Sequence, residues 1–225
     1  MTRRRLYLMR HAEVAYFDAD GRPVAPGQVL LTPEGEEQAR AASEALAGVQ
    51  FGRVLTSGLR RTVDTARIVA PAVEPEEWPE LRELEPGRLR EISDDDLEAT
   101  FAGAFRGAIP PETPFLGGET IGSLFDRVIP ALERLLDDPA WDAVLAVLHS
   151  GVNRAILSYA VTGERRFFGG FEQAPACVNI VDIGDDWIVR AVNHTPYDPV
   201  HARGRRTTME ELYELYLPYR KARRT

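Results

Sequence analysis

The most constraining feature of this sequence is the unbroken apolar run Ala-Val-Leu-Ala-Val-Leu at residues 143–148, which stops abruptly at His149. A run of this length without polar alternation is typical of a β-strand that is buried on both faces. Such strands occur in parallel sheets that helices cover on both sides. The run therefore predicts an α/β protein.

Other short apolar runs alternate along the chain with helical patterns, which supports a three-layer α/β/α sandwich around a mainly parallel sheet. Thr32 followed by Pro33 predicts the start of a helix that reaches about Ala47, and we expect Ser57 to cap another helix. Further strands are predicted at 6–9, 53–56, 178–183 and 187–192, the last two as a hairpin, and further helices at about 59–70, 121–135 and 151–160.

The length of 225 residues fits one domain over residues 1–225. Residues 71–118 are rich in proline and glycine turns, and we interpret them as loops and helix over one edge of the sheet, with an insertion at about 85–118. The tail at about 203–225 is basic. Its apolar stripe of Met209, Leu212, Leu215 and Tyr216 predicts a docked helix.

Composition excludes several functional classes. The chain has 27 Lys and Arg against 35 Asp and Glu, a net charge of −8, which disfavours binding to nucleic acid or an anionic membrane. Cys177 is the only cysteine, so a disulfide framework and a cysteine zinc site are excluded. No apolar run approaches the roughly 20 residues of a membrane span, and the segment after the basic N-terminus is too short for a signal peptide. We expect a cytoplasmic protein.

Two histidines directly follow predicted strands. His11 follows the strand at 6–9 and His149 follows the strand at 143–148. In open α/β sheets, ligands bind beyond the carboxyl ends of the strands, so both imidazoles are candidates for one pocket. The alternative is that each histidine only satisfies a backbone group at the end of its strand.

Six short motifs occur in an order that resembles the histidine phosphatase superfamily, in its phosphoglycerate mutase-like branch, over residues 5 to about 193. The motifs are Leu8-Met9-Arg10-His11, Leu31-Thr32-Pro33-Glu34-Gly35, Thr56-Ser57-Gly58-Leu59-Arg60-Arg61, Leu81-Arg82-Glu83, Gly117-Gly118-Glu119-Thr120 and His149-Ser150-Gly151. The resemblance implies the phosphoglycerate mutase-like fold, with the insertion over the active site. It also implies phosphoryl transfer through a phosphohistidine on His11.

The resemblance assigns roles to individual residues. Arg10 and Arg61 match the two arginines that clamp the phosphate, and His149 matches the histidine that stabilises the transition state. Glu83 matches the general acid and base, although Glu85 is a rival two residues away. The same motifs place Glu119 and Ser150 at the substrate. No metal or other cofactor is implied, and the metal-ligand spacings that would indicate one are absent.

The sequence departs from the family pattern beyond His11. Many members carry a serine or threonine three residues after the nucleophile and an asparagine six after it, but here these positions are Val14 and Phe17. We expect a more apolar pocket mouth. The double-arginine element that mutases use for substrate is also not evident in residues 85–118.

These departures favour a metal-independent phosphatase that acts on a small-molecule phosphate ester, a histidine acid phosphatase-type phosphoric monoester hydrolase. Two alternatives stay open: a cofactor-dependent phosphoglycerate mutase, and a catalytically silent binding member of the family. The intact set of candidate catalytic residues argues against the silent member. The sequence gives neither the ester nor the oligomeric state.

Overall fold

The central sheet runs through the middle of the molecule in the order β3-β2-β5-β1-β7-β8. The computed structural model describes residues 3–202 and 205–223. Parallel pairing joins β3 (Glu76–Glu77), β2 (Arg53–Thr56), β5 (Ala143–Leu148) and β1 (Arg4–Arg10). The hairpin of β7 (Val178–Ile183) and β8 (Trp187–His194) adds two antiparallel strands at the other edge. The predicted mainly parallel sheet is confirmed.

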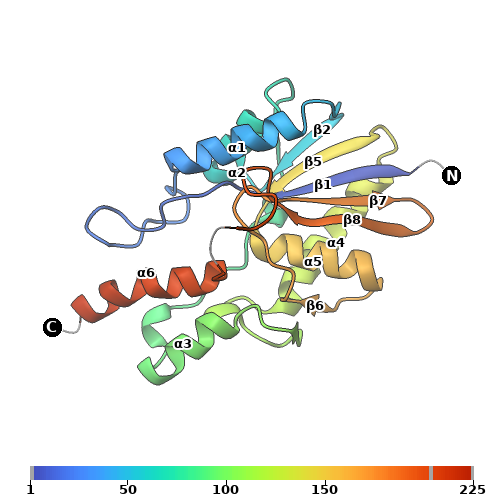
Figure 1. Ribbon diagram of the computed structural model, residues 1–225. Helices are drawn as coiled ribbons and strands as arrows, with labels where there is room; N and C mark the ends of the chain where they lie inside the picture. Colours follow the sequence, from blue (N-terminus) through green and yellow to red (C-terminus); the bar gives the residue numbers. More distant parts are fainter. Residues whose placement is uncertain (1–2, 203–204, 224–225) are drawn as a thin grey trace.

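Helices cover both faces of this sheet (Figure 1), which confirms the three-layer architecture. The helices α1 (Pro33–Ala45) and α2 (Arg60–Val69) lie on one face, and α4 (Ile121–Asp137) and α5 (Ser150–Thr162) on the other. Alternate residues of β5 enter different cores. Leu145 and Val147 pack toward α1 and α2, whereas Val144, Ala146 and Leu148 pack toward α4 and α5. Every residue of β5 is buried, as its unbroken apolar run predicted.

The helix starts are predicted correctly at Thr32 and wrongly at Ser57. The Thr32 hydroxyl accepts a hydrogen bond from the Gly35 amide (2.9 Å) and caps α1. In contrast, α2 begins at Arg60 with Leu59 as its N-cap residue, because Gly58 turns the chain with a φ of +77° before the helix starts. The Ser57 side chain is thereby free to bond elsewhere.

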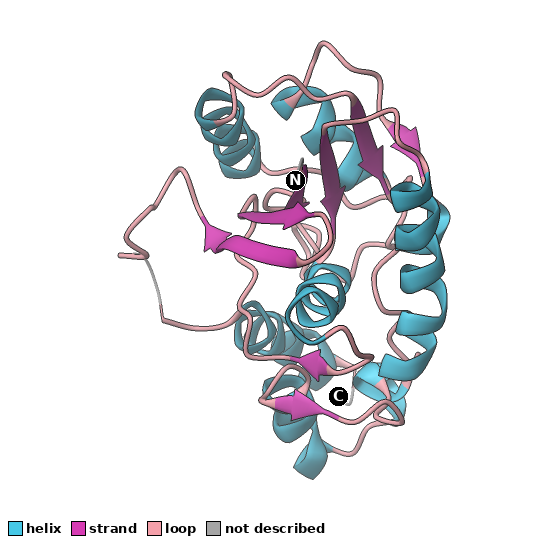
Figure 2. Cartoon of the chain, turned by 90° about the vertical axis from the view of Figure 1, so that its right-hand side faces the viewer, coloured by secondary structure: helices cyan, strands magenta, loops and turns pink. Residues whose placement is uncertain are grey.

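The segment at 71–118 contributes more to the fold than loops over a sheet edge. It begins with β3, which extends the sheet, and then leaves it. A separate two-stranded sheet pairs β4 (Ala108–Ile109) with β6 (Phe167–Phe168), and Figure 2 shows this small sheet separated from the main one by α5. The remaining elements are the short helices η1 (Pro79–Leu81), η2 (Leu89–Glu91) and η3 (Phe115–Gly117) and the helix α3 (Asp94–Gly103).

The C-terminal tail forms the predicted helix, α6 (Thr208–Ala222), and this helix lies against α3 (Figure 1). Met209 and Tyr216 are buried there, but Leu215 is 55% exposed, so its inclusion in the docked stripe is wrong. Residues 203, 204, 224 and 225 of the predicted tail lie outside the described residues. No helix within the described ranges is long and apolar enough to cross a membrane.

Gly35 fixes the distance between α1 and the loop that follows His11. A Cβ atom at this position would lie 2.1 Å from the Glu13 carbonyl oxygen. That oxygen also accepts a hydrogen bond from the Thr32 amide (3.1 Å), so the loop and the helix start are held together at this point.

We therefore expect Gly35→Ala to destabilise the protein by about 1–3 kcal/mol, because backbone would have to shift to admit the methyl group. Alanine has the higher helix propensity, so propensity alone predicts the opposite sign. Gly48→Ala is the matched control, since its added Cβ would have no atom within 4 Å beyond its own residue and its two chain neighbours. Urea unfolding measures both, and a Gly35→Ala variant as stable as the control would contradict the packing argument.

Candidate active site

The two strand-end histidines meet at the carboxyl edge of the sheet. Arg10 pairs with Leu148 in the register of β1 and β5, and the His11 amide donates to the Leu148 carbonyl (3.0 Å). His11 and His149 therefore follow neighbouring parallel strands at the same level. Their ring centroids lie 5.3 Å apart, and both side chains are buried.

The His11 ring is held in one orientation. Its Nδ1 lies 2.8 Å from the Ala12 carbonyl oxygen, which only accepts hydrogen bonds, so Nδ1 carries the proton and Nε2 keeps its lone pair. Burial, followed by the charges of Arg10 and Arg61, holds the pKa of His11 well below its usual value. The ring is therefore neutral and nucleophilic at neutral pH.

Three buried nitrogen atoms around the two rings lack hydrogen-bond partners: Arg10 Nε, Arg61 Nε and His149 Nδ1. Among the described residues, only Asn153 Oδ1 shares this condition. Buried polar atoms without partners are rare in proteins, and each one asks for an explanation such as a missing ligand. Two guanidinium groups and an imidazole together form a site for an anion with several oxygen atoms.

The two arginines are anchored through their other nitrogen atoms. Arg10 Nη1 donates to the Gln173 carbonyl oxygen (2.7 Å) and to Thr208 Oγ1 (2.8 Å). Arg61 Nη1 donates to the Pro26 carbonyl oxygen (3.0 Å). These bonds fix each guanidinium group and leave its Nε free for a ligand.

Ser57 contacts the second histidine, a connection that the sequence analysis missed. Its Oγ lies 2.8 Å from His149 Nε2, and the same oxygen lies 3.2 Å from Thr62 Oγ1. Burial is the main cause that keeps the pKa of His149 well below its usual value, and the charges of Arg61 and Arg10 act in the same direction. In the tautomer that accepts from the Ser57 hydroxyl at Nε2, the proton of the neutral ring is on Nδ1, the atom without a partner. The only sequence signal was the position of Ser57 within the Thr-Ser-Gly-Leu motif.

The Glu83 side chain is half-buried and contacts the start of α5, whereas the Glu85 side chain is exposed. The Gly151 amide donates to both carboxylate oxygens of Glu83 (3.1 and 3.0 Å), and the Leu84 amide donates to Oε1 (3.0 Å). A Cβ atom on Gly151 would lie 2.6 Å from Glu83 Oε1, so glycine is what admits the carboxylate here. Of the two rivals, this geometry favours Glu83.

Glu119 lines the cavity but is already paired. Its carboxylate accepts from Arg127 Nε (2.8 Å) and Nη2 (2.9 Å), and from the Glu85 amide (3.1 Å). Arg127 Nη1 also donates to the carbonyl oxygens of Glu80 and Arg82 (both 2.6 Å). We therefore interpret Glu119 as a residue that positions the segment carrying Glu83, instead of the substrate-binding role that the sequence suggested.

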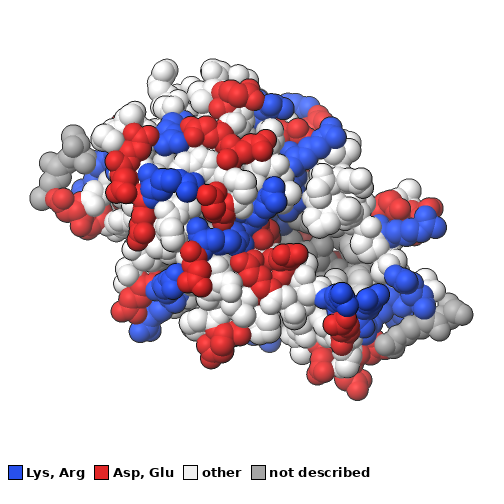
Figure 3. All heavy atoms as spheres, turned by 180° about the vertical axis from the view of Figure 1, so that it is seen from behind, with Lys and Arg blue, Asp and Glu red and all other residues white. Residues whose placement is uncertain are grey.

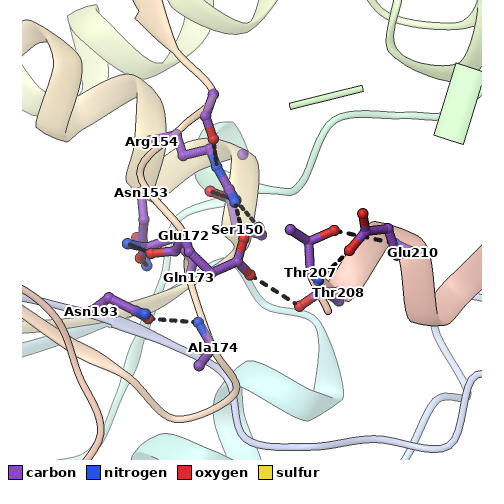
Figure 4. Close-up of polar contacts among 12 residues, drawn as sticks. Ser150, Asn153, Arg154, Glu172, Gln173, Ala174, Asn193, Thr207, Thr208 and Glu210 are labelled. Atoms are coloured by element: carbon purple, nitrogen blue, oxygen red, sulfur yellow. Dashed lines mark hydrogen bonds and ion pairs between the residues drawn. The ribbon is translucent and has the colours of Figure 1, made fainter. Parts of the chain in front are cut away.

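A polar network behind the site connects α5 to the C-terminal helix (Figure 4). Ser150 Oγ accepts from Arg154 Nη1, and Arg154 Nη2 donates to Glu172 Oε2 (3.0 Å). Thr208 Oγ1 in turn donates to Glu172 Oε1 (3.4 Å) while it accepts from Arg10. Sequence reasoning missed Arg154, Glu172 and Thr208, because Thr208 lies 198 positions from Arg10 and no local pattern joins them.

The site opens into a cavity of about 860 Å³. Arg10, Arg61, Glu83 and Ser150 line it, and most other lining residues are apolar. Phe17 is one of them, as predicted. Val14 is not, because it is buried in an isolated bridge with Leu31, so its predicted place at the pocket mouth is wrong.

Surface charge is mixed on the face that Figure 3 shows, where acidic and basic side chains lie interspersed among uncharged areas. The positive charge at the site comes from buried side chains, since Arg10 is 3% and Arg61 6% exposed. Within the described part of the chain, no group of three or more His, Cys, Asp or Glu side chains could hold a metal ion.

Comparison with known proteins shows the family to which the chain is similar. Residues 6–195 match the sequence profile of the histidine phosphatase superfamily (branch 1). A Serratia proteamaculans protein named "Probable phosphoglycerate mutase GpmB" is 34% identical over 168 residues, which cover 70% of this chain and 74% of that protein.

Solved structures share the fold. An alpha-ribazole phosphatase from Shigella flexneri superposes with a TM-score of 0.64 at 24% identity, over 84% of this chain and 96% of that one. A mycobacterial glucosyl-3-phosphoglycerate phosphatase gives 0.68 at 24% identity, over 85% and 99% of the two chains. At this identity the likeness shows the fold alone.

The lowered pKa values predict that neither His11 nor His149 protonates near pH 6.5 in the folded protein. In an NMR titration, their ring C–H resonances should therefore keep the chemical shifts of a neutral imidazole as the pH falls through about 6.5. His11→Gln and His149→Gln variants assign the two signals. Because the unfolded chain does take up these protons, the free energy of unfolding should also decrease as the pH drops below about 6.5. A titration midpoint at or above 6.5 for either ring would refute the description of a neutral pair.

Proposed function

The chain belongs to branch 1 of the histidine phosphatase superfamily, and we propose that within it this protein hydrolyses phosphate monoesters through a phosphohistidine on His11. One observation carries the proposal. Arg10, Arg61 and His149 each have a buried nitrogen atom without a partner, the His149 and His11 ring centroids lie 5.3 Å apart, and the neutral His11 ring keeps its lone pair on Nε2.

In the first step, Nε2 of His11 attacks the phosphorus atom, and the bond from phosphorus to the ester oxygen breaks. Negative charge on the transferring phosphoryl group is stabilised by Arg10, Arg61 and His149, which are fixed before substrate arrives. Protonated Glu83 gives its proton to the departing oxygen, so the alcohol leaves neutral.

In the second step, water replaces the alcohol. The Glu83 carboxylate, held by the Gly151 and Leu84 amides, accepts a proton from that water as its oxygen attacks phosphorus. The phosphorus–nitrogen bond breaks, inorganic phosphate is released, and His11 returns to its neutral form. The cycle uses no metal ion.

A phosphoglycerate mutase is the second candidate, because the Serratia relative carries that name. A mutase must keep water from the phosphohistidine and grip a small three-carbon acid in a closed pocket. A largely apolar cavity of about 860 Å³ suits this less than it suits hydrolysis of a larger ester. A cytoplasmic location stays a prediction.

Glu83→Gln should lower kcat by about 10²–10⁴-fold, since it removes the proton donor and base. The matched variant Glu85→Gln should keep most of the activity, because the Glu85 side chain is exposed and the amide at the start of α5 binds Glu83 instead. Steady-state phosphate release from an alkyl phosphate, whose alcohol needs a proton to leave, measures both variants, and His11→Ala gives the background. A larger loss for Glu85→Gln would exchange the two roles.

Hydrolysis should exceed mutase turnover on the same preparation. We expect phosphate release from aryl phosphates such as p-nitrophenyl phosphate, and little interconversion of 2- and 3-phosphoglycerate even with bisphosphoglycerate present. EDTA should leave phosphate release unchanged. Mutase turnover above phosphate release on every ester tried would favour the second candidate, and strong inhibition by EDTA would require a metal ion in the cycle.

A further inference from the structure

One side of the cavity is formed by side chains from two helices and their flanking loops that pack outside the main sheet. We call these side chains the apolar wall. It consists of Phe101, Phe105, Phe115, Met209, Leu212 and Tyr216. Phe101 belongs to α3, and Met209, Leu212 and Tyr216 belong to α6.

Most of the apolar wall lies outside the two cores that flank the sheet, although Phe105 and Phe115 also pack against the core on the α4 and α5 side. Most of it forms a separate cluster between α3 and α6, in which Phe101 stacks on Tyr216 with centroids 5.8 Å apart. Phe105 stacks on Phe115 at 5.3 Å. Phe105, Phe115 and Leu212 keep part of their surface exposed to the cavity, so they present apolar area that the fold itself leaves uncovered.

The wall is held at both ends of α6. At the start of the helix, Thr208 accepts a hydrogen bond from Arg10 (2.8 Å). Near its end, the buried Arg220 donates to Asp94 Oδ1 (2.7 Å) and to the carbonyl oxygens of Leu89 (2.8 Å) and Ile92. The middle of α6, with Leu212, therefore spans the cavity between two fixed points, one of which is a phosphate-site arginine.

Charge and apolar surface are segregated within the cavity. Apart from Arg10 and Arg61, its charged lining residues belong to the segment 82–85 and to the Glu119–Arg127 pair that holds this segment. No charged residue of α3 or α6 lines it within the described part of the chain. A ligand that fits both regions has an anionic end and an apolar body.

We propose that the alcohol part of the substrate is an aromatic or extended apolar group that lies against the apolar wall while its phosphoryl group occupies the site at His11. This inference rests on the proposed function. A volume of about 860 Å³ is in the range of roughly 300–1,000 Å³ that takes ligands far larger than a three-carbon acid. Burying the body against the wall provides affinity, and it directs the ester oxygen toward Glu83.

The test uses two stable phosphonates with the same anionic group, methylphosphonate and naphthylmethylphosphonate, and measures their dissociation constants by calorimetry. The wild-type chain should prefer the naphthyl compound on the order of tenfold to a hundredfold, as expected for burying one aromatic ring system. Equal affinity for the two compounds would overturn the inference, and this comparison depends on no variant.

A matched pair of variants on α6 locates the preference. Leu212→Asn should reduce it at least about fivefold with little effect on methylphosphonate, whereas Leu215→Asn, at an exposed position on the same helix that does not line the cavity, should leave it unchanged. Leu212→Ala repeats the test if asparagine unfolds the helix. Equal losses from Leu212 and Leu215 variants would overturn the placement at the wall.

The two proposals fail separately, because phosphonate binding needs no turnover. A chain that prefers the naphthyl compound but releases phosphate from no ester would refute the hydrolase and retain the apolar ligand. A chain that hydrolyses esters yet shows no preference between the phosphonates would refute only the inference about the apolar wall.

Discussion

The parallel pairing of β1 with β5 is the contact on which the site depends. β1 is buried from Leu6 to Arg10 and β5 is buried along its full length, and the two strands lie side by side in the sheet. β1 ends at Arg10 and β5 at Leu148, each directly before a histidine. Because the register places Arg10 beside Leu148, the two histidines that follow stand next to each other. The burial that stabilises the strands also removes water from the rings, which keeps both imidazoles neutral.

The same burial leaves polar atoms without hydrogen-bond partners, which a ligand can provide. Arg10, Arg61 and His149 each have a buried nitrogen atom without a hydrogen-bond partner, a condition that costs free energy. A phosphoryl group supplies several acceptor oxygens at once. Since the arginines are already anchored by carbonyl oxygens, they need little rearrangement as charge develops, and this is the main contribution that a protein makes to phosphoryl transfer.

The insertion and the C-terminal helix decide the shape of the space beyond the phosphoryl group. They pack on each other through the cluster around Phe101 and Tyr216, and Thr208 of α6 accepts a hydrogen bond from Arg10. Phe105 and Phe115 of the insertion also pack against the core on the α4 and α5 side. A fold organised in this way can change the alcohol that it accepts by altering α3 and α6 without disturbing the sheet.

The sequence by itself determined the layers, the central strand and the strand-end positions of His11 and His149. A strand that is buried on both faces needs apolar side chains at successive positions, and such a run can be recognised from the sequence alone. The motifs also pointed to Arg10, Arg61 and Glu83. Only the tertiary structure decided the choice of Glu83 over Glu85 and the pairing of Glu119 with Arg127. It also decided the contact of Ser57 with His149, the burial of Val14 away from the cavity and the position of α6 beside the site. These depend on side-chain contacts between segments up to 198 positions apart, and no periodicity along the chain encodes such contacts.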